Sequence, residues 1–484
     1  MITIKMELDY KALGFKCGLE CHQQLEGKKL FCNCPTLNSD KVPDIIVERR
    51  LKAVAGEMGD VDIAAEFEMM KKKKIIYEAN SEDVCLIETD EEPPHELNKQ
   101  ALETAIKVAL LLNAKIVDEV QIMRKIVVDG SNVSGFQRTA LVAMNGYIET
   151  SMGKVRIPTI CLEEEAAQKL EEAKDFVRYR LDRLGIPLIE IATSSDIKNP
   201  EHAKEVAAYI GMVLRSVEGV KRGLGTIRQD VNISISNGAR TEIKGFQDLR
   251  SIPKVIEYEV KRQLDAIKQE KKLEKEVRRA ETDYTTSFLR PLPGAARLYP
   301  ETDALPVAIS KDYTHTIRKN LPKLLIQRVE EFKKKYKLTD DLAKEIINHE
   351  YFEAFAAQFK NVDPLFIATA LVVTPKEIGR RYARYALDIS KLTEKDFEEV
   401  LGYLNQGKIT KDAVIDILIE KLSEEKIDIS KYSVVAEADI ENEIKKIIKE
   451  KPGLSVSAYM GLIMQRYRGK VDGKRVIEML KGFI

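Results

Sequence analysis

Several short, strand-like segments of the sequence carry acidic and polar side chains of the types that bind magnesium and phosphate. They are Glu20-x-His22, Glu163-Glu164, Glu190, Asp230-x-Asn232 and Glu242-x-Lys244. Carboxylates lose hydration when they are built into a fold, so they need a cation close by. A pocket that holds Mg²⁺ and a phosphate group would supply one. The chain has neither a Walker-type phosphate loop nor a kinase-type Gly-rich loop, so any use of ATP must follow another route.

Glu20 and His22 share one face of a predicted strand. At about 3.3 Å per residue their positions lie about 7 Å apart, a spacing that can bracket one metal ion or a water molecule. The structural alternative is a histidine bonded to a nearby carbonyl, with the glutamate at the surface.

The segment 221–249 predicts a hairpin that turns at Asn237-Gly238. A two-residue turn would pair Ile233 with Glu242 and send Glu242 to the face opposite Asp230. A three-residue turn shifts the register by one residue and gathers one polar set: Asp230, Asn232, Glu242 and Lys244. A hairpin with a merely solvated polar face is the simpler alternative.

Cysteine spacing raises the question of zinc. Cys32-x-Cys34 offers two ligands, whereas a tetrahedral zinc site needs two more. The candidates for the remaining positions are Cys17, Cys21, Cys85 and His95, and none of them forms a second Cys-x-x-Cys.

The C-terminal stretch 464–484 has six basic residues against two acidic ones, with Tyr467 among them, and is the best local candidate for a nucleic-acid patch. Basic residues interleaved with an aromatic are typical of nucleic-acid contacts. The same pattern also fits an ordinary helix. The basic residues that we expect to bind RNA are Arg466, Arg468, Lys470, Lys474 and Arg475.

Composition limits the classes of protein that fit. The chain has 484 residues, enough for several domains, and 44% of them are hydrophobic. Lys+Arg and Asp+Glu balance at 78 each, so net charge gives no evidence for a nucleic-acid partner. Six cysteines in a chain of this length do not form a disulfide framework. We find no signal peptide and no apolar run of membrane-spanning length, and we expect a soluble, cytoplasmic protein.

The elements that must position these residues change character along the chain. Residues 1–308 read as a mixed α/β body, and 309–392 and 393–484 read as two all-α modules. Within the body, Gly185–Thr193 predicts a buried strand, and Asn199-Pro200 predicts the start of a helix. The fold class is therefore α+β, with a cradle-like body followed by two helical modules.

Several longer motifs resemble those of the E subunit of archaeal glutamyl-tRNA(Gln) amidotransferases, a family related to the bacterial B subunit. The resemblance runs from about residue 14 to the end of the chain. The motifs are GLECHQQLEGKKLFCNCP, VVDGSNVSGFQRTALVA, TICLEEEAA, RLGIPLIEIAT, GLGTIRQDVNISI, TEIKGFQDL, RPLPGAARLYPETD and MGLIMQRYRGKVDGKRVIEMLK.

The resemblance implies an ATP-dependent amidation that yields Gln-tRNA(Gln). The γ-carboxylate of glutamate misacylated onto tRNA(Gln) becomes an acyl phosphate. Ammonia from a partner amidase, the D subunit of the complex, then displaces the phosphate. Phosphoryl transfer of this kind depends on placed Mg²⁺ and cationic donors rather than on a covalent nucleophile.

Carried over position by position, the resemblance implies the following site. The catalytic positions would be Glu20, His22, Glu164, Asp230 and Glu242, and the metal ligands would be this set together with Glu163. ATP or phosphate contacts would come from Arg228, Lys244 and Arg290. Adjacent Glu163 and Glu164 would point in opposite directions on a strand, which suggests two different ions.

Two departures from the family pattern stand out. The bacterial relatives complete a zinc site with Cys-x-x-Cys, whereas this chain offers only Cys85 in that neighbourhood. The E subunit also carries an inserted domain similar to one in bacterial aspartyl-tRNA synthetases. Around 265–284 this chain has only a Lys/Glu-rich connection, so the insertion is either absent from the protein or missing from the sequence.

Two other functions compete with this reading. One is a tRNA-binding scaffold without chemistry, and the other is a metal-dependent phosphodiesterase acting on RNA. Converging carboxylates would repel RNA unless a metal intervenes, which disfavours a scaffold. ATP hydrolysis that depends on both Glu-tRNA(Gln) and Mg²⁺ would separate all three.

Overall fold

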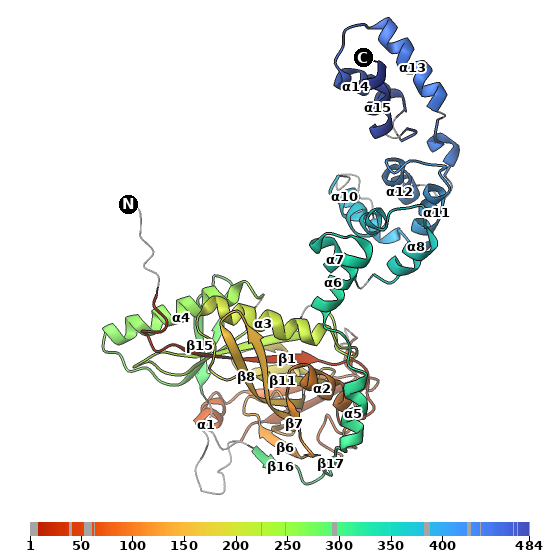
Figure 1. The fold of residues 1–484 in the computed structure, drawn as a ribbon. Helices are drawn as coiled ribbons and strands as arrows, with labels where there is room; N and C mark the ends of the chain where they lie inside the picture. The colour runs from red at the N-terminus through yellow and green to blue at the C-terminus, as the bar shows by residue number, and fades with distance from the viewer. Residues whose placement is uncertain are drawn as a thin grey trace. The chain divides into compact units, whose positions relative to one another are not determined.

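The computed structural model describes residues 8–37, 41–52, 61, 63–223, 225–246, 248–292, 298–347, 349–381, 388–423, 427–435, 437–467, 469–471 and 473–483. The chain divides into two compact units, Met1–Leu325 and Ile326–Ile484 (Figure 1). The first unit is mixed α/β and the second is helical, which confirms the predicted fold class.

A large sheet of eleven strands, counted over the described residues, is the frame of the first unit. Its order is β15-β14-β13-β12-β1-β11-β8-β7-β6-β16, and β4 pairs with β7. The strands are β1 (Lys16–Gln24), β4 (Lys115–Ile116), β6 (Ile122–Ile126), β7 (Phe136–Thr150), β8 (Gly153–Glu164), β11 (Pro187–Ala192), β12 (Ile227–Ser234), β13 (Thr241–Lys244), β14 (Glu276–Ala280), β15 (Thr286–Pro291) and β16 (Leu298–Pro300).

Smaller elements complete the first unit. A four-stranded sheet has the order β2-β3-β10-β9, and β17 pairs with β5. These strands are β2 (Ile45–Arg50), β3 (Lys74–Ala79), β5 (Glu119–Val120), β9 (Gln168–Glu172), β10 (Phe176–Arg180) and β17 (Val307–Ala308). The helices are α1 (Ile63–Met70), α2 (Lys99–Leu111), α3 (Pro200–Arg215), α4 (Ser251–Lys268) and α5 (Lys311–Lys319).

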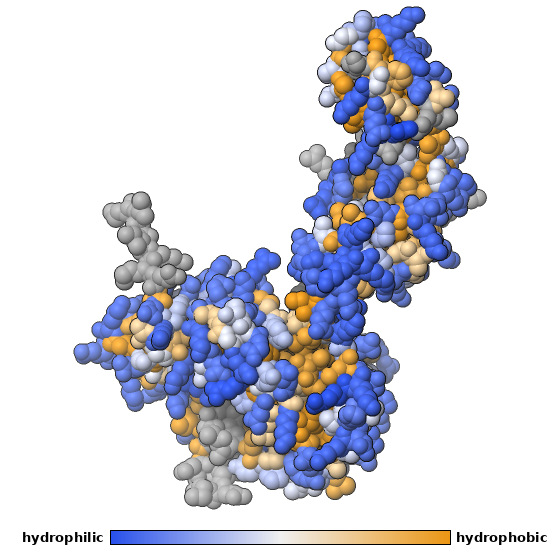
Figure 2. Space-filling view, in the orientation of Figure 1, coloured by the Kyte–Doolittle hydropathy of each residue, from blue (hydrophilic) through white to orange (hydrophobic). Residues whose placement is uncertain are grey.

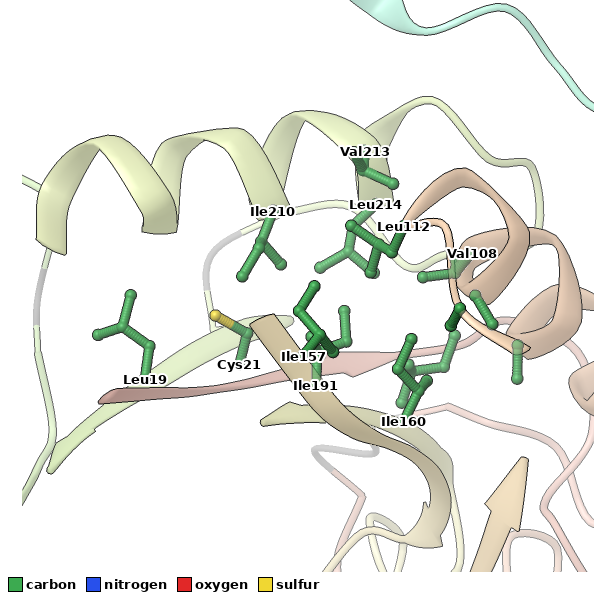
Figure 3. Packing of buried hydrophobic residues seen from close by; sticks show 14 of the residues in the cluster. Leu19, Cys21, Val108, Leu112, Ile157, Ile160, Ile191, Ile210, Val213 and Leu214 are labelled. Atoms are coloured by element: carbon green, nitrogen blue, oxygen red, sulfur yellow. The ribbon is translucent and has the colours of Figure 1, made fainter. Parts of the chain in front are cut away.

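One face of the large sheet packs on helices and forms the main core. Leu19 and Cys21 of β1 point toward Ile210 of α3, and α2 packs beside α3 (Figure 3). Because side chains alternate along a strand, the residues between them on β1 face the other way. That alternation turns Glu20 and His22 toward the face where the site lies.

Helix α3 begins where the sequence predicts. The side chain of Asn199 accepts a hydrogen bond from the backbone N–H of His202, and Pro200 occupies the first turn. The apolar stripe of this helix is buried, with Val206, Ile210 and Val213 fully covered. Each such side chain contributes about 1.5–3 kcal/mol by leaving water, so the helix is held firmly against β1.

The connection between α4 and β14 is short. It runs over residues 269–275, and β14 then pairs in parallel with β13. The range 265–284, where the family's insertion is expected, therefore holds the end of α4, a short loop and strand β14 in this chain.

The second unit is built of helices in its described part. They are α6 (Leu325–Tyr336), α7 (Asp340–Ile346), α8 (Phe352–Gln358), α9 (Pro364–Ala368), the π-helix η1 (Thr369–Val373), α10 (Thr374–Arg381), the 3₁₀ turn η3 (Ile389–Lys391), α11 (Glu394–Asn405), α12 (Ala413–Ser423), the 3₁₀ turn η4 (Ile429–Tyr432), α13 (Glu437–Glu450), α14 (Val456–Tyr467) and α15 (Gly473–Phe483). None of the described helices is both long and apolar enough to cross a membrane.

Hydrogen bonds within the second unit cross the boundary at residue 392 that the sequence predicts between its two helical modules. Gln358 of α8 donates to Glu398 of α11, and Asn361 bonds to Asn405, so α11 is tied to residues before the expected boundary at 392. Helices α13, α14 and α15 share a small apolar core around Ile444, Tyr459 and Leu480. On the visible face, hydrophilic residues predominate over these helices (Figure 2).

Candidate active site

A pocket of about 860 Å³ lies on the face of the large sheet opposite its helical cover. Strand pairing gathers its acidic residues: Glu20 on β1 is opposite Asp230 on β12, and Asn232 on β12 is opposite Glu242 on β13. Of the two hairpin registers that the sequence allows, the structure therefore has the shifted one. The backbone N–H of Gly238 donates to the carbonyl of Ile235 and closes the turn, and Asn237 has φ +62°.

The first acidic group consists of Glu20, Asp230 and Glu242. Each offers a carboxylate oxygen, and these atoms lie within 4.8 Å of one another. Burial raises the pKa of Glu20, and the charges of Glu190, Glu242 and Asp230 raise it further. Three crowded carboxylates are a donor set that suits Mg²⁺, because a hard cation would relieve their repulsion. The residues present fit such an ion.

Lys244 neutralises part of this charge. Its Nζ lies 2.5 Å from Asp230 Oδ2 and 2.6 Å from Glu242 Oε1. Burial alone would lower the pKa of Lys244, but the two carboxylates outweigh it and raise the pKa. Lys244 is therefore a fixed cation at the edge of the carboxylate group.

The second group surrounds His22 and Glu190, which are directly opposite on β1 and β11. His22 Nε2 lies 3.3 Å from Glu190 Oε2, and Lys125 Nζ lies 3.0 Å from the same oxygen. Lys125 also contacts Glu163 at 3.1 Å. Burial and the neighbouring Glu190 charge raise the pKa of Glu163 to about 7. The Glu190 carboxyl keeps a lowered pKa despite burial, because His22 and Lys125 both face it.

Glu164 is not part of this pocket. Adjacent strand residues face opposite ways, and Glu164 points away from Glu163, into an ion pair with Arg138 at 3.3 Å. Arg138 also contacts Glu301 at 2.9 Å. Both carboxylates are buried and already paired with Arg138. Glu164 therefore makes a structural ion pair, and it does not lie among the pocket residues where it was expected as a metal ligand.

The cationic residues expected to meet phosphate all line the pocket. Arg228, Lys244 and Arg290 border it together with Arg240. Arg228 is anchored by Glu165 at 2.5 Å. Burial raises the pKa of Glu165, but the charges of Arg228 and Arg183 and a hydrogen bond from Gln24 outweigh burial and lower the pKa.

Sequence reasoning missed Lys125, Glu165 and Arg240. Strand alternation could have identified Glu165. Residues two apart on a strand share a face, so Glu163 and Glu165 are expected to point the same way, whereas Glu163 and Glu164 are not. Lys125 offered a weaker signal, because it follows another cation, Arg124, in the segment 122–126, and the sequence does not show which of the two faces the pocket.

The cysteine cluster lies apart from this pocket. Cys32, Cys34, Cys85 and Glu88 bring ligand atoms within 4.8 Å of one another. Of the other candidates, Cys17 and Cys21 are buried in the core of the large sheet, and His95 lies beside Glu92. Cysteine spacing therefore predicted Cys32 and Cys34, and Cys85 was one of four candidates for the remaining positions. The fourth group, Glu88, is a carboxylate that the sequence did not indicate.

The geometry of this cluster fits a cation. The Cys32 thiol donates to Glu88 Oε1 at 3.0 Å, and Lys29 Nζ lies 3.2 Å from the same oxygen. Burial raises the pKa of Cys85 to about 12, and the charge of Glu88 adds to the effect. A zinc ion would lower the pKa of the thiols, because it stabilises thiolates. It also accepts cysteine and carboxylate ligands in a tetrahedral set.

The basic residues of the C-terminal stretch lie on α14, α15 and the segment between them. Arg466 is exposed and paired with Glu443, and Lys474 and Arg475 are exposed on α15. Lys470 is half-buried, and Arg468 lies outside the described residues.

Comparison with known proteins identifies the family of this chain. The family model described as the GatB/GatE catalytic domain matches residues 15–315, which include the whole carboxylate pocket. The chain belongs to this family.

Similar proteins over nearly the whole length carry the name of the E subunit of glutamyl-tRNA(Gln) amidotransferase. The protein from Methanocaldococcus jannaschii is 39% identical over 98% of this chain and 99% of its own length. Those from Archaeoglobus fulgidus and Methanosarcina barkeri are 36% and 37% identical, each over 98% of both chains. The first alignment spans 628 positions although this chain has 484 residues, so long gaps fall in this chain.

Proposed function

We propose that this chain is the subunit of a tRNA-dependent amidotransferase that activates the γ-carboxylate of glutamate on Glu-tRNA(Gln). The observation that carries the proposal is the group formed by Glu20, Asp230 and Glu242 beside Lys244, within the part of the chain that matches the GatB/GatE catalytic domain. The names of the relatives supply the substrate.

The reaction has two steps. A γ-carboxylate oxygen of the glutamyl group attacks the terminal phosphorus of ATP, and the bond to the bridging oxygen of ADP breaks. Ammonia then attacks the carbonyl carbon of the acyl phosphate, inorganic phosphate leaves with the electrons of the C–O bond, and the nitrogen loses a proton to give the amide.

The chain's own residues position these groups. Glu20, Asp230 and Glu242 would hold Mg²⁺, with His22 and Glu190 offering a second set that shares Glu20. When bound, Mg²⁺ neutralises charge on the transferring phosphate. Lys244, Arg228 and Arg290 would contact phosphate oxygens, and Lys125 keeps Glu163 and Glu190 in place.

The proposal includes partners and a second metal. An amidase partner, the D subunit of the complex, would supply ammonia. The tail residues Arg466, Arg468, Lys470, Lys474 and Arg475 would contact tRNA(Gln). Zinc would bind at Cys32, Cys34, Cys85 and Glu88, away from the chemistry, as a structural ion.

The test uses the purified full-length chain with ATP, Mg²⁺, ammonium and Glu-tRNA(Gln). We expect ADP and Gln-tRNA(Gln) to form together, and neither to form with uncharged tRNA(Gln) or without Mg²⁺. Binding of tRNA without ADP would instead indicate a scaffold, and shortened tRNA without ADP would indicate a phosphodiesterase. The chain alone should not hydrolyse glutamine, since its function requires a separate amidase.

A further inference from the structure

A second, basic pocket of about 250 Å³ adjoins the carboxylate pocket. The two pockets share Asp129, Leu289 and Arg290 in their linings. We call the second pocket the cationic cleft, and its basic residues are Lys71, Lys73, Lys169, Arg279 and Arg290. They come from β9, β14, β15 and the segment between α1 and β3, so four separate parts of the body converge on this cleft.

Strand register links the two pockets across the large sheet. Lys244 on β13 is directly opposite Arg279 on β14, and Glu242 is opposite Val277. Val277 is in turn opposite Arg290 on β15. Neighbouring strands are about 4.8 Å apart, and β14 and β15 lie two and three strands away from β12. The surface therefore changes from acidic to basic over a short distance.

The cleft retains positive charge that the protein does not neutralise. Lys73 and Lys169 both contact Glu172, at 2.8 and 2.9 Å, and lower the pKa of Glu172 to about 2. Within the described part of the chain, the guanidinium groups of Arg279 and Arg290 have no hydrogen bond or ion pair.

The remaining acidic groups of the cleft have partners other than Arg279 and Arg290. Glu68 pairs with Lys71 at 2.8 Å. Asp129 Oδ1 accepts hydrogen bonds from the N–H and the hydroxyl of Ser131, at 3.0 and 2.6 Å. The two guanidinium groups are therefore available to a ligand.

We propose that the cationic cleft binds a phosphate group of a ligand whose other end reaches the carboxylate pocket. Guanidinium forks match the geometry of phosphate oxygens. The volume is below the range of roughly 300–1,000 Å³ for whole small-molecule sites, so the cleft takes only part of a ligand. The proposal deepens the proposed function and rests on it for the source of the phosphate, which is either ATP or the RNA strand that carries the glutamyl group.

The first test is independent of that function. Inorganic pyrophosphate is titrated calorimetrically, without metal, into the full chain and into Arg279→Gln, Arg290→Gln and Arg279→Lys. We expect each glutamine variant to weaken binding at least tenfold and the lysine variant to retain part of it. Arg215→Gln, an exposed arginine at the end of α3, is the matched control and should bind like wild type. Equal binding by wild type and Arg279→Gln, or none by wild type, would overturn the proposal.

Two further titrations identify the source of the phosphate. If the cleft takes ATP, Arg279→Gln weakens MgATP binding and leaves the affinity for Glu-tRNA(Gln) unchanged. If it takes the RNA strand, the variant weakens Glu-tRNA(Gln) binding and lowers its salt dependence by about 0.7–0.9 in the log–log slope. Pyrophosphate binding that depends on Arg279, in a chain that binds neither MgATP nor Glu-tRNA(Gln), would leave the anion site standing and reject the proposed function.

Discussion

Glu20 and Asp230 are cross-strand partners on β1 and β12, and their carboxylate oxygens lie within 4.8 Å of each other. The β-sheet imposes this closeness, because directly opposed residues share a face. Two carboxylates held this way repel each other unless a cation is present. Burial, together with the charges of the neighbouring carboxylates, raises the pKa of Glu20. The fold therefore builds a site that binding of a divalent ion would stabilise.

Asp230→Asn and Glu242→Gln should each lower the rate of acyl-phosphate formation by about 10²-fold or more, because losing a ligand that neutralises charge costs several kcal/mol at the transition state. Affinity for tRNA should persist, since neither residue lies in the basic C-terminal stretch. Single-turnover ADP formation measures the first effect and filter binding the second. Glu149→Gln, an exposed strand carboxylate, is the control. Near-normal turnover in either pocket variant would reject the metal assignment.

Glu164 should behave differently from its neighbour. Removing one partner of a buried ion pair costs roughly 3–5 kcal/mol, so Glu164→Ala should lower the free energy of unfolding by about that amount. Its effect on Mg²⁺ affinity should be small, because Glu164 faces Arg138 and not the pocket. Urea unfolding and Mg²⁺ titration of the folded protein separate the two. A large loss of Mg²⁺ affinity at unchanged stability would return Glu164 to the metal site.

Local patterns in the sequence predicted the elements well and the contacts between distant elements less well. Alternation placed Glu20 and His22 on one face, and the Asn237-Gly238 turn limited the hairpin to two registers, one of which is observed. The pairing of β1 with β11, which brings Glu190 to His22, depends on strand order. Strand order is set by packing across the whole body, and for the same reason the sequence did not reveal Lys125.

The cysteine cluster illustrates the same limit. Cys32 and Cys34 are close in sequence, but Cys85 and Glu88 reach them only through the fold. A cysteine motif identifies thiolate partners, whereas a carboxylate ligand leaves no such signal in the sequence.

Zinc should copurify with the protein at one ion per chain. Cys32→Ser and Cys85→Ser should each reduce the metal content and lower the melting temperature by several degrees, because metal binding contributes directly to folding. Metal analysis and thermal unfolding with and without a chelator measure these effects. Cys161→Ala, outside the cluster, should keep the zinc. Full stability of the metal-free protein would contradict a structural role for zinc.

His202 should make stability depend on pH. Its Nδ1 accepts a hydrogen bond from Lys198 N–H at 3.1 Å, so the ring must stay neutral, and burial lowers its pKa. The unfolded chain then takes up its proton first, near about pH 6.5. The contribution to stability is therefore complete above about pH 6.5 and is lost as the pH falls toward the folded-state pKa. His202→Gln should flatten this slope in urea unfolding, whereas His95→Gln, at an exposed site, should not.

The C-terminal helices should supply much of the affinity for tRNA. Carboxylates in the body repel a long polyanion, so binding must rely on basic surfaces, and Lys474, Arg475 and Lys481 are exposed on α15. Changing all three to glutamine in the full chain should weaken Glu-tRNA(Gln) binding strongly. It should also reduce the log–log salt slope by roughly 0.7–0.9 for each phosphate that the variant no longer neutralises.

A matched triple change at Lys268, Lys271 and Lys272, exposed at the end of α4 and in the loop after it, controls for overall charge. This control removes three positive charges from the body, as many as the α15 variant removes, and should have little effect on binding. ADP formation at saturating tRNA should stay near wild type in both variants, because neither triple touches the carboxylate pocket. If the α15 variant binds as tightly as wild type with the same salt slope, the body reads the tRNA and these helices serve another purpose.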